Sequence, residues 1–349
     1  MPELPEVETV RRGLSELIVG KRVAAVWHDW AKSFPNAESD VEQFLIGACV
    51  TAVKRRAKVL LIELDSQYSL VCHLKMTGQM VYVKRQASSV KRQEERFGAG
   101  HPNSSLVDRL PDKSTRVILC LQGRDDALES NVRKLRSTEE VVHDVRRLST
   151  GAVDTAVGQE HWQDFWLGQK AQQCGAHLFF NDQRKFGWVK LIPTIEVPNI
   201  DFMKKVGPEP LETSFTADQF IERLQRRKNT NIKAAILDQT VLAGVGNIYA
   251  DESLWGAKIN PKTLVKNVPA AKLNTLFQEL RYVLELAIEK GGSTDKDYVS
   301  AEGKRGSYLS FARVFRREGQ QCPRHPGIFI QKIRVAGRGT HICTKCQKE

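Results

Sequence analysis

The chain has 349 residues, of which 41% are hydrophobic, and it carries a net charge of +12 with an isoelectric point near 9.4. This length indicates about two domains, and the basic balance favours a polyanionic partner. No run of about 18 apolar residues occurs, which excludes a membrane span, and the N-terminus lacks the pattern of a signal peptide. Seven cysteines, an odd number, argue against a disulfide framework, so we expect buried thiols in a reducing cytoplasm.

The first predicted element is a helix that begins within the opening MPELPEVETVRRGL. Pro5 suits a first helical position, because the missing N–H of proline costs nothing there. Glutamates precede arginines, which is the order that the helix dipole favours. Apolar residues recur at helical spacing before Gly20, at Val7, Val10, Leu14 and Leu17. An end so rich in proline and glutamate is either a tail or a working part of the molecule.

Eight runs rich in Val, Ile, Leu and aromatic residues then predict strands. The runs are RVAAVWHDW, ACVTAV, KVLLIELD, YSLVCHL, QMVYVK, TRVILCLQ, AHLFFND and FGWVKLIP. With turn residues between them, they predict a β-sandwich of two sheets that reaches about Pro193. Residues 85–112 interrupt the pattern as a predicted mobile loop. Residues 123–175 are predicted to be an inserted, solvated subdomain that packs its tryptophans on the sandwich, with a partner-binding or DNA-binding insert as the alternative.

A helical half begins after Pro208 and Pro210. The stretch Thr216-Ala-Asp-Gln219 is a capping box that opens a helix. The segments NTNIKAAILD and GNIYADESLW predict two more helices, joined by QTVLAGVG. The segment AAKLNTLFQELRYVLELAIEKGG is the clearest helix, with one apolar stripe and a stop at Gly291. A polar loop then runs to about Gln321, before a short cysteine-bearing segment.

That last segment carries the strongest local motif, Cys322-Pro-Arg-His325 followed by Cys343-Thr-Lys-Cys346. Pairs at this spacing let two ligands from one knuckle reach the same metal. Three cysteines and one histidine fill a tetrahedral zinc site and leave no open position, so we predict one structural Zn²⁺ and no catalytic metal. The spacer of 17 residues fits a β-hairpin.

Two further groups of residues could contact nucleic acid. Gly244 and Gly246 bend the chain before a helix whose N–H groups can hold a phosphate, and Asn247 can add a side-chain contact. His73 and Met76 lie at a strand end, and Arg184 and Phe186 stand two apart. An arginine beside an aromatic ring can fill the space left when a base leaves the stack. Composition alone favours core packing for Met76 and Phe186 and a surface charge for Arg184.

Taken in order, the motifs resemble formamidopyrimidine-DNA glycosylases over nearly the whole chain apart from the two interruptions. The motifs are PELPEVET, the RRAK of residues 55–58, HLKMTG, QRKFG, GPEPL, LAGVGNIYADE, GGST, GKRG and the zinc segment. The resemblance implies excision of oxidised purines, namely 8-oxoguanine and formamidopyrimidines, from duplex DNA, with strand cleavage by β,δ-elimination.

The resemblance also assigns catalytic roles near the N-terminus. It implies that Met1 is removed and that Pro2 becomes a secondary-amine nucleophile, which forms a Schiff base with the damaged sugar. An α-amino group has a pKa near 8, so it is partly neutral at physiological pH. Glu3 matches the acid that protonates the ribose ring oxygen, Glu6 matches a supporting acidic position, and Lys58 matches a phosphate-contacting lysine that assists elimination.

The same resemblance implies several DNA contacts. Met76, Arg184 and Phe186 match the void-filling triad, while Asn247 and Arg338 match phosphate contacts. His73 and Lys233 are further DNA-contact candidates, Lys233 by a weaker match. The loop Ser293–Tyr308 resembles the segment that closes over the extruded purine.

Three features depart from the family pattern. His325 replaces the usual fourth cysteine, a change that zinc accepts. The segment RVFRREG and the unusual GKRGS leave the lesion preference open. The 123–175 insertion is predicted to be an outward excursion from a hairpin.

The expected fold is α+β. Its parts are an N-terminal two-sheet β-sandwich with an N-terminal helix over 1–200, a helix–two-turn–helix domain over 208–315 with a lesion-recognition loop at 291–310, and a β-hairpin zinc finger over 316–349. We expect a cytoplasmic, nucleoid-associated bacterial monomer that binds damaged double-stranded DNA. The alternatives are an oxidised-pyrimidine glycosylase of the endonuclease VIII type, a non-catalytic damage-binding zinc protein, and an RNA-binding or ribosomal zinc factor.

Overall fold

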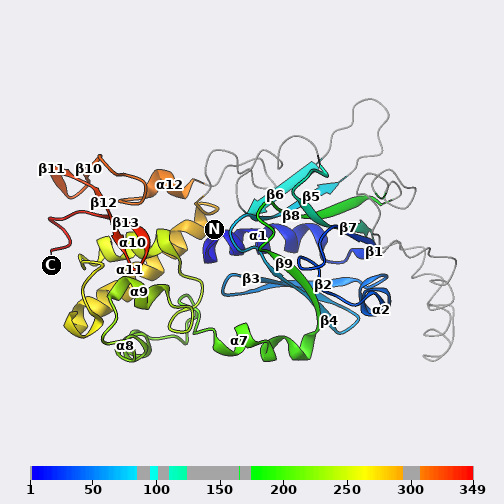
Figure 1. Cartoon of the computed structure of the whole chain (residues 1–349), viewed down its shortest axis with the longest axis horizontal. Helices are drawn as coiled ribbons and strands as arrows, with labels where there is room; N and C mark the ends of the chain where they lie inside the picture. Colours follow the sequence, from blue (N-terminus) through cyan, green and yellow to red (C-terminus); the bar gives the residue numbers. More distant parts are fainter. Residues whose placement is uncertain are drawn as a thin grey trace. The chain divides into compact units, whose positions relative to one another are not determined.

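A computed structural model describes residues 2–84, 95–100, 110–123, 165, 174–293 and 307–348 (Figure 1). The chain divides into two compact units that do not follow its linear order. The first, here the helical unit, comprises Met1–Val10, Arg55–Val59 and Pro198–Glu349. The second, here the sandwich unit, comprises Arg11–Lys54 and Leu60–Val197. No helix in the described ranges is long and apolar enough to cross a membrane.

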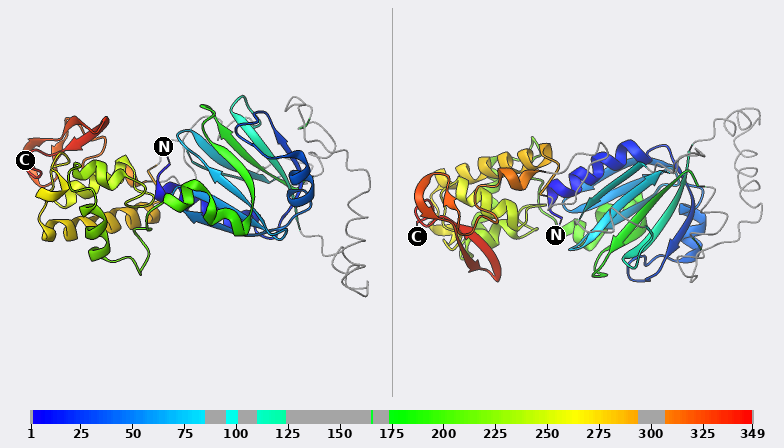
Figure 2. Two further views of the ribbon diagram at one scale, coloured as in Figure 1. Left: turned by 60° about the horizontal axis from the view of Figure 1, so that its bottom comes forward. Right: turned by 90° about the horizontal axis from the view of Figure 1, so that it is seen from above.

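The sandwich unit is built from two antiparallel sheets, as the strand pattern predicts (Figure 2). One sheet has the strand order β1-β7-β8-β5-β6 and the other has the order β2-β3-β4-β9. The strands are β1 (Arg22–His28), β2 (Val50–Arg56), β3 (Val59–Leu64), β4 (Tyr68–His73), β5 (Gly78–Lys84), β6 (Glu95–Gly100), β7 (Thr115–Gln122), β8 (Ala176–Asp182) and β9 (Trp188–Pro193). The helix α1 (Leu4–Ile18) precedes them, and α2 (Glu38–Asp40) and the π-helical turn η1 (Val41–Leu45) join β1 to β2.

Both faces of the five-stranded sheet are covered. Side chains of β7 and β8 that include Leu119, Leu178 and Phe180 enclose an interior space with Leu70 and Val189 of the other sheet. Alternate residues of a strand point to opposite faces of the sheet, so the residues next to these in sequence form a second apolar layer on the outer face. That layer comprises Ala25, Trp27, Val81, Val83, Ile118, Cys120, Cys174 and Phe179, together with Phe165 from the inserted segment.

The two predicted interruptions are only partly described. The prediction of a loop over 85–112 is wrong for Glu95–Gly100, which forms β6 and pairs with β5 from Gln79↔Gly100 to Lys84↔Glu95. Charged residues and glycines give this run a low intrinsic β-propensity, so its sequence did not predict a strand. Pairing with the neighbouring strand β5 outweighs that low propensity. The predicted helical periodicity within 123–175 and its tryptophans lie outside the described residues.

Within the described ranges, most of the helices belong to the helical unit. Its elements are the 3₁₀ turn η3 (Thr194–Asn199) at its entry, α7 (Asp201–Lys205), α8 (Ala217–Gln225), α9 (Ile232–Leu237), α10 (Asn247–Gly256), the 3₁₀ turn η4 (Val265–Asn267), α11 (Ala270–Glu289) and α12 (Tyr308–Phe311). The predicted capping box is present, since Thr216 and Gln219 exchange side-chain and backbone hydrogen bonds. The apolar stripe of α11 packs into the core, and Gly291 and Gly292 follow the helix with φ of +73° and +88°.

The C-terminal segment forms two short hairpins. The strands β10 (Gln321–Cys322) and β11 (His325–Phe329) pair first, and β12 (Gln331–Val335) and β13 (Arg338–Ile342) form the hairpin predicted for the zinc spacer. Between β12 and β13, Ala336 and Gly337 have φ of +49° and +75°. Positive φ at both central residues gives a turn whose twist matches that of the flanking strands. The turn brings Arg338 to the start of β13.

Candidate active site and nucleic-acid interface

The start of the chain is held against the N-terminus of α10. The backbone N–H of Leu4 donates to the carbonyl oxygen of Gly244 at 3.0 Å. A Cβ at Gly246 would lie 2.2 Å from the Cδ of Glu3, so only glycine leaves space for that carboxyl. The glycines predicted to bend the chain before α10 therefore also make room for the N-terminal residues. Pro2 itself is buried.

Glu3 is a buried carboxyl that retains a proton near neutral pH. Its Oε1 accepts a hydrogen bond from the N–H of Ile248 at 3.1 Å, while its Oε2 is buried with no partner among the described residues. Burial raises the pKa of Glu3 to about 7, opposed by the charge of Lys58 and reinforced by that of Glu6. A carboxyl with such a pKa can serve as a general acid at physiological pH.

Glu6 organises the surroundings of Glu3 by accepting three hydrogen bonds. Its Oε2 accepts from the backbone N–H of Glu3 at 2.8 Å, and its Oε1 accepts from the hydroxyl of Tyr249 at 2.6 Å and the N–H of Ser293 at 2.8 Å. Burial and the nearby Glu6 carboxylate raise the pKa of Tyr249, which therefore stays a donor. Glu6 thus links α1, α10 and the residues that follow α11.

Lys58 is the cation of this group, and the RRAK turn positions it. Its Nζ donates to the carbonyl oxygen of Val245 at 2.9 Å. Burial lowers the pKa of Lys58, opposed by the carboxylates of Glu3 and Glu6. Ala57, with φ of +54°, forms the turn before it, and Glu209 of the GPEPL motif accepts hydrogen bonds from Ala57 N and Arg55. The two motifs therefore support one another and hold Lys58 beside Glu3.

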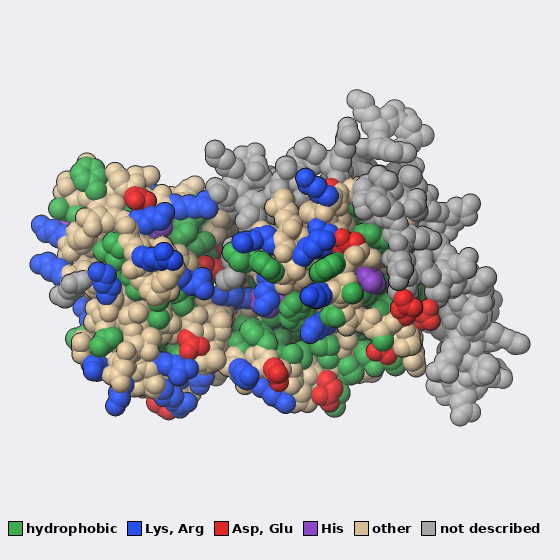
Figure 3. Space-filling view, in the orientation of Figure 1, with side chains coloured by type: hydrophobic (Ala, Val, Ile, Leu, Met, Phe, Trp, Pro, Cys, Tyr) green, Lys and Arg blue, Asp and Glu red, His purple; other side chains and the backbone are tan. Residues whose placement is uncertain are grey.

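Asn247 and Arg338 are brought together because α10 packs against the hairpin of β12 and β13, here the zinc hairpin. The Nδ2 of Asn247 donates to the carbonyl oxygen of Gly339 at 3.0 Å, and Arg338 is exposed. Lys and Arg side chains are spread over the visible face of each unit, with few acidic side chains between them (Figure 3). An exposed guanidinium beside a helix N-terminus is an arrangement suited to phosphate.

Lys233, predicted as a direct DNA contact, is instead fully buried. Its Nζ donates to Asp251 at 2.6 Å, to the hydroxyl of Thr340 at 2.7 Å and to the carbonyl oxygen of Gly339 at 3.3 Å. These partners use all three N–H groups of the ammonium. Asp251 also accepts from the backbone N–H of His341 at 2.9 Å. Lys233 therefore joins α9 and α10 to the hairpin that bears Arg338, and its side chain is not available to DNA in this structure.

Met76, Arg184 and Phe186 form an exposed cluster at one end of the sandwich unit. The side chains of Met76 and Phe186 are 41% and 55% exposed, so neither is a core residue. Arg184 Nη1 lies 3.4 Å from the sulfur of Met76, and its guanidinium stacks 5.5 Å from the centre of the Phe186 ring. Asp182 holds the turn, since its carboxylate accepts from Arg184 N at 3.2 Å and Gly187 N at 2.6 Å.

His73 differs from these three because it is buried. Its Nδ1 accepts a hydrogen bond from the N–H of Lys75 at 3.0 Å, which shapes the turn that presents Met76. Its ring lies 5.8 Å from that of Trp188. In this structure His73 supports the turn, and its predicted direct contact with DNA is untested.

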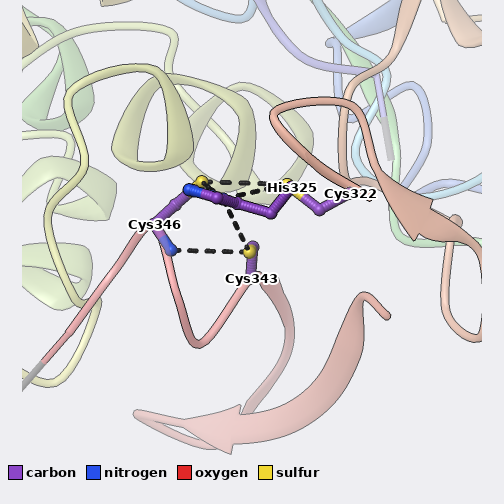
Figure 4. A group of neighbouring side chains, drawn as sticks. All are labelled: Cys322, His325, Cys343 and Cys346. Atoms are coloured by element: carbon purple, nitrogen blue, oxygen red, sulfur yellow. Dashed lines mark hydrogen bonds between the residues drawn. The ribbon is translucent and has the colours of Figure 1, made fainter. Parts of the chain in front are cut away.

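The four predicted zinc ligands converge from two knuckles (Figure 4). The Sγ atoms of Cys322 and Cys346 are 3.7 Å apart, and the Nδ1 of His325 lies 3.2 to 4.0 Å from the three sulfurs. Tetrahedral Zn²⁺ with Zn–S bonds of about 2.3 Å places its ligand atoms roughly 3.5–3.8 Å apart. The donors therefore fit one structural zinc ion. The two knuckles also pack on Trp255 of α10, which fixes the finger to the helices.

Several residues of the site were not singled out from sequence. Tyr249, Asp251 and Glu209 lie inside the quoted motifs LAGVGNIYADE and GPEPL, but only their contacts reveal what they hold. Polar residues within these otherwise apolar motifs were the signal that the sequence offered, because a buried polar side chain is costly without a partner. The loop expected to close over the lesion, Ser293–Tyr308, is described only at its ends.

Comparison with known proteins identifies the lineage. Three family models match, described as the formamidopyrimidine-DNA glycosylase N-terminal domain at residues 1–150, the formamidopyrimidine-DNA glycosylase H2TH domain at 206–298, and a zinc finger found in FPG and IleRS at 327–348. A formamidopyrimidine-DNA glycosylase of Latilactobacillus sakei is 34% identical over 99% of this chain and 98% of its own. The chain belongs to the formamidopyrimidine-DNA glycosylase family. It is therefore a DNA repair enzyme, a bifunctional DNA glycosylase and AP lyase.

Other relatives and structures agree with this membership. The formamidopyrimidine-DNA glycosylase of Herpetosiphon aurantiacus is 35% identical over 99% of this chain and all of its own. Lactococcus lactis Fpg in complex with DNA containing an abasic site has a TM-score of 0.73 and 28% identity, covering 99% of this chain and 100% of that one. The structure of MutM with carbocyclic 8-oxo-G in DNA has a TM-score of 0.72 at 28% identity, covering both chains fully. The fold prediction is thereby confirmed.

Proposed function

We propose that this glycosylase excises oxidised purines, 8-oxoguanine and formamidopyrimidines, from duplex DNA through Pro2. The observation that carries the proposal is the buried carboxyl of Glu3, with a pKa of about 7, next to the residue that would be the nucleophile. The substrate class follows from the relatives, since solved complexes of this family hold Fapy-dG and carbocyclic 8-oxo-G in DNA.

The reaction requires that Met1 be removed. The neutral secondary amine of Pro2 then attacks the sugar C1′, the glycosidic C1′–N bond breaks, and the base leaves with its electron pair and takes up a proton. The attacking nitrogen loses its proton, the C1′–O4′ bond breaks as the ring oxygen is protonated, and the resulting iminium acidifies the C2′ protons. Loss of a C2′ proton expels the 3′ phosphate, and a second elimination expels the 5′ phosphate. No redox reagent is consumed.

The surrounding residues take distinct roles in this scheme. Protonated Glu3 donates its proton to the ribose ring oxygen and opens the sugar. Lys58 binds a lesion phosphate and assists elimination, because a buried cation favours an anion at close range. Glu6 fixes the backbone of Glu3 through the bond from the Glu3 N–H, and so acts as a positioning residue.

DNA binding is assigned to both units. Asn247 and the exposed Arg338 take phosphates at the helical unit, and Lys233 positions them through Gly339. Met76, Arg184 and Phe186 fill the space left by the extruded nucleotide, because exposed apolar and stacked cationic side chains can replace a lost base. The protein acts as a monomer in the bacterial cytoplasm, associated with the nucleoid. Its domains in sequence order cover residues 1–200, 208–315 and 316–349.

Borohydride trapping tests the proposal. Untagged protein with Met1 shown to be absent is incubated with a duplex that carries a single 8-oxoguanine opposite cytosine, reduced, and run on a denaturing gel. A covalent band is expected, because the iminium is reduced to a stable amine. The Pro2→Gly variant should give a much weaker band, and a protein that keeps an N-terminal tag should give none, since its proline nitrogen is an amide.

Other outcomes point to the alternatives. A band with a 5-hydroxycytosine duplex alone would assign the enzyme to oxidised pyrimidines, as in the endonuclease VIII type. Binding to the lesion without any band would indicate a damage-binding protein without chemistry. A trapped species in the tagged protein would overturn the assignment of Pro2.

A further inference from the structure

A second group of metal-ligating side chains lies in the sandwich unit, apart from the zinc finger residues. Cys120, Cys174 and His177 each offer one ligand atom, and these atoms all lie within 4.8 Å of one another. All three residues are buried, with exposures of 0%, 2% and 0%. The cysteines form no disulfide. Buried thiols often pack as small apolar groups, but a histidine ring nitrogen within the same small volume adds a further metal ligand.

Strand register creates this cluster. Cys120 on β7 is the direct partner of His177 on β8, so their side chains stand side by side on the same face of the sheet. Cys174 precedes β8 by two residues, which gives Cys174 and His177 the spacing Cys174-Gly-Ala-His177. This spacing is the same as that of Cys322-Pro-Arg-His325 in the finger. The chain therefore uses one ligand spacing twice.

We propose that Cys120, Cys174 and His177 bind a second Zn²⁺ ion. Sulfur and imidazole ligands favour zinc over magnesium or calcium. Two thiolates and a neutral imidazole around Zn²⁺ have no net charge, which suits an apolar layer where a net charge would be costly. Three protein ligands fill three of the four tetrahedral positions and leave the fourth to a water molecule or a further donor.

The location gives this ion a structural role. Cys120 lies near the end of β7, before the insertion, and Cys174 lies at the far end of the insertion, two residues before β8. An ion held by both cysteines joins the two ends of the insertion. Phe165, from within the insertion, is buried in the same apolar layer as Cys120 and Cys174. The ion and this aromatic ring would together fix Phe165 and both ends of the insertion at the outer face of the five-stranded sheet. This proposal is independent of the proposed lesion chemistry.

Zinc stoichiometry tests the second site. The untagged full chain is dialysed against metal-free buffer after zinc loading, and zinc per protein is measured by mass spectrometry. Wild type should hold two equivalents, and Cys174→Ser should hold one. Cys49→Ser is the matched control, because Cys49 is a buried thiol of the same unit outside the cluster, and it should keep two.

A second set of variants distinguishes loss of the proposed site from misfolding. The double variant Cys343→Ser/Cys346→Ser lacks the finger site, so it should retain one equivalent, which Cys174→Ser should then remove. Cobalt bound to that double variant should show thiolate-to-cobalt charge-transfer absorption. One equivalent in wild type, two equivalents that survive Cys174→Ser, or a Cys120–Cys174 disulfide in the mapped protein would each overturn the site.

Discussion

The carboxyl of Glu3 shows how one buried residue can link burial to chemistry. One oxygen has a single donor and the other has no partner among the described groups, so the charged form is poorly stabilised. Lys58 offsets part of that cost, but burial dominates and leaves the pKa at about 7. A glutamate on the surface would be fully ionised at this pH and could not act as an acid.

The rate of base excision should therefore depend on pH through Glu3. The protonated fraction of Glu3 falls as pH rises through about 7. The single-turnover rate should therefore fall tenfold per pH unit above about pH 8, where the Pro2 amine is already neutral. The measurement is excision of 8-oxoguanine from pH 5.5 to 9. Glu3→Gln should lower the rate by about 10²–10⁴-fold and remove the fall in rate at high pH. A wild-type rate that stays flat between pH 6 and 9 would contradict the assignment.

Stability should change in the same pH range. The folded-state pKa of Glu3 lies above its ordinary value of 4.5, so its contribution is fully present below pH 4.5 and is lost as pH rises through about 7. The loss reaches on the order of 3 kcal/mol. Relative to Glu3→Gln, wild type should become less stable to urea between pH 5 and 8. Parallel unfolding curves for the two proteins across this range would contradict the raised pKa.

At the scale of elements, the start of α10 is shaped by the residue before it. Gly246 has extended backbone angles, φ of −132° and ψ of −163°, which any residue can adopt. Its requirement for glycine comes instead from the carboxyl of Glu3 beside it. The bend before α10 therefore serves packing against the N-terminal residues.

The substitution Gly246→Ala should move Glu3 without unfolding the protein. The added Cβ would lie 2.2 Å from the Cδ of Glu3, so the carboxyl must shift. We expect excision to fall by roughly 10²-fold, as misplacement of a catalytic group by about 1 Å does. Gly123→Ala is the control, since a Cβ there lies within 4 Å of no described residue. Equal activity in the two variants, measured under single-turnover conditions, would argue against close packing at this site.

Local hydrogen bonds fix the turn between β8 and β9, which carries the exposed ring of Phe186. Asp182 and Thr77 hold the backbone of Arg184, and the Arg184 guanidinium covers one face of the Phe186 ring. This support leaves an aromatic side chain exposed to solvent in a fixed turn. Exposure of a large apolar residue is otherwise unfavourable, and such residues often mark an interaction site.

Loss of the Phe186 ring should weaken base extrusion. Unstacking a nucleotide costs a few kcal/mol, and an inserted side chain offsets part of it. We expect Phe186→Ala to lower excision from duplex DNA by about 10–100-fold, with a smaller effect on cleavage at a pre-formed abasic site. Ile195→Ala serves as the control, because Ile195 is 82% exposed and outside this cluster. Equal losses on both substrates would refute the wedge role.

For the whole molecule, net charge alone does not determine how DNA is held. A net charge of +12 favours any polyanion, so it cannot select a lesion. Specific placement needs cations fixed by structure, and the zinc hairpin provides one. Lys233, Asp251 and Thr340 join that hairpin to α9 and α10, which leaves Arg338 exposed at a fixed place.

The salt dependence of DNA binding should report the Arg338 contact. The logarithm of affinity falls linearly with the logarithm of salt concentration, with a slope of about −0.9 per neutralised phosphate. Arg338→Gln should make the slope less negative by about 1 and weaken binding to any sequence. Lys54→Gln is the charge-matched control, because Lys54 is paired with Glu63 at 2.8 Å. An unchanged slope in Arg338→Gln would exclude a phosphate contact.

Sequence alone determined the local features of this protein. Runs of Val, Ile, Leu and aromatic residues identified nearly every sandwich strand in the described ranges, and the caps and glycines located α8 and the end of α11. The spacing of Cys322, His325, Cys343 and Cys346 was sufficient for the zinc site. These features depend on neighbours close in sequence, where periodicity and ligand spacing carry the information.

Only the tertiary structure decided which distant residues meet. It buried Lys233 against Asp251 and Thr340, and it placed Cys120 beside His177 across two strands separated by the insertion. It also recruited Met1–Val10 and Arg55–Val59 into the helical unit, where the pKa of Glu3 is raised. Burial and pairing depend on partners far along the chain, so no local pattern contains them.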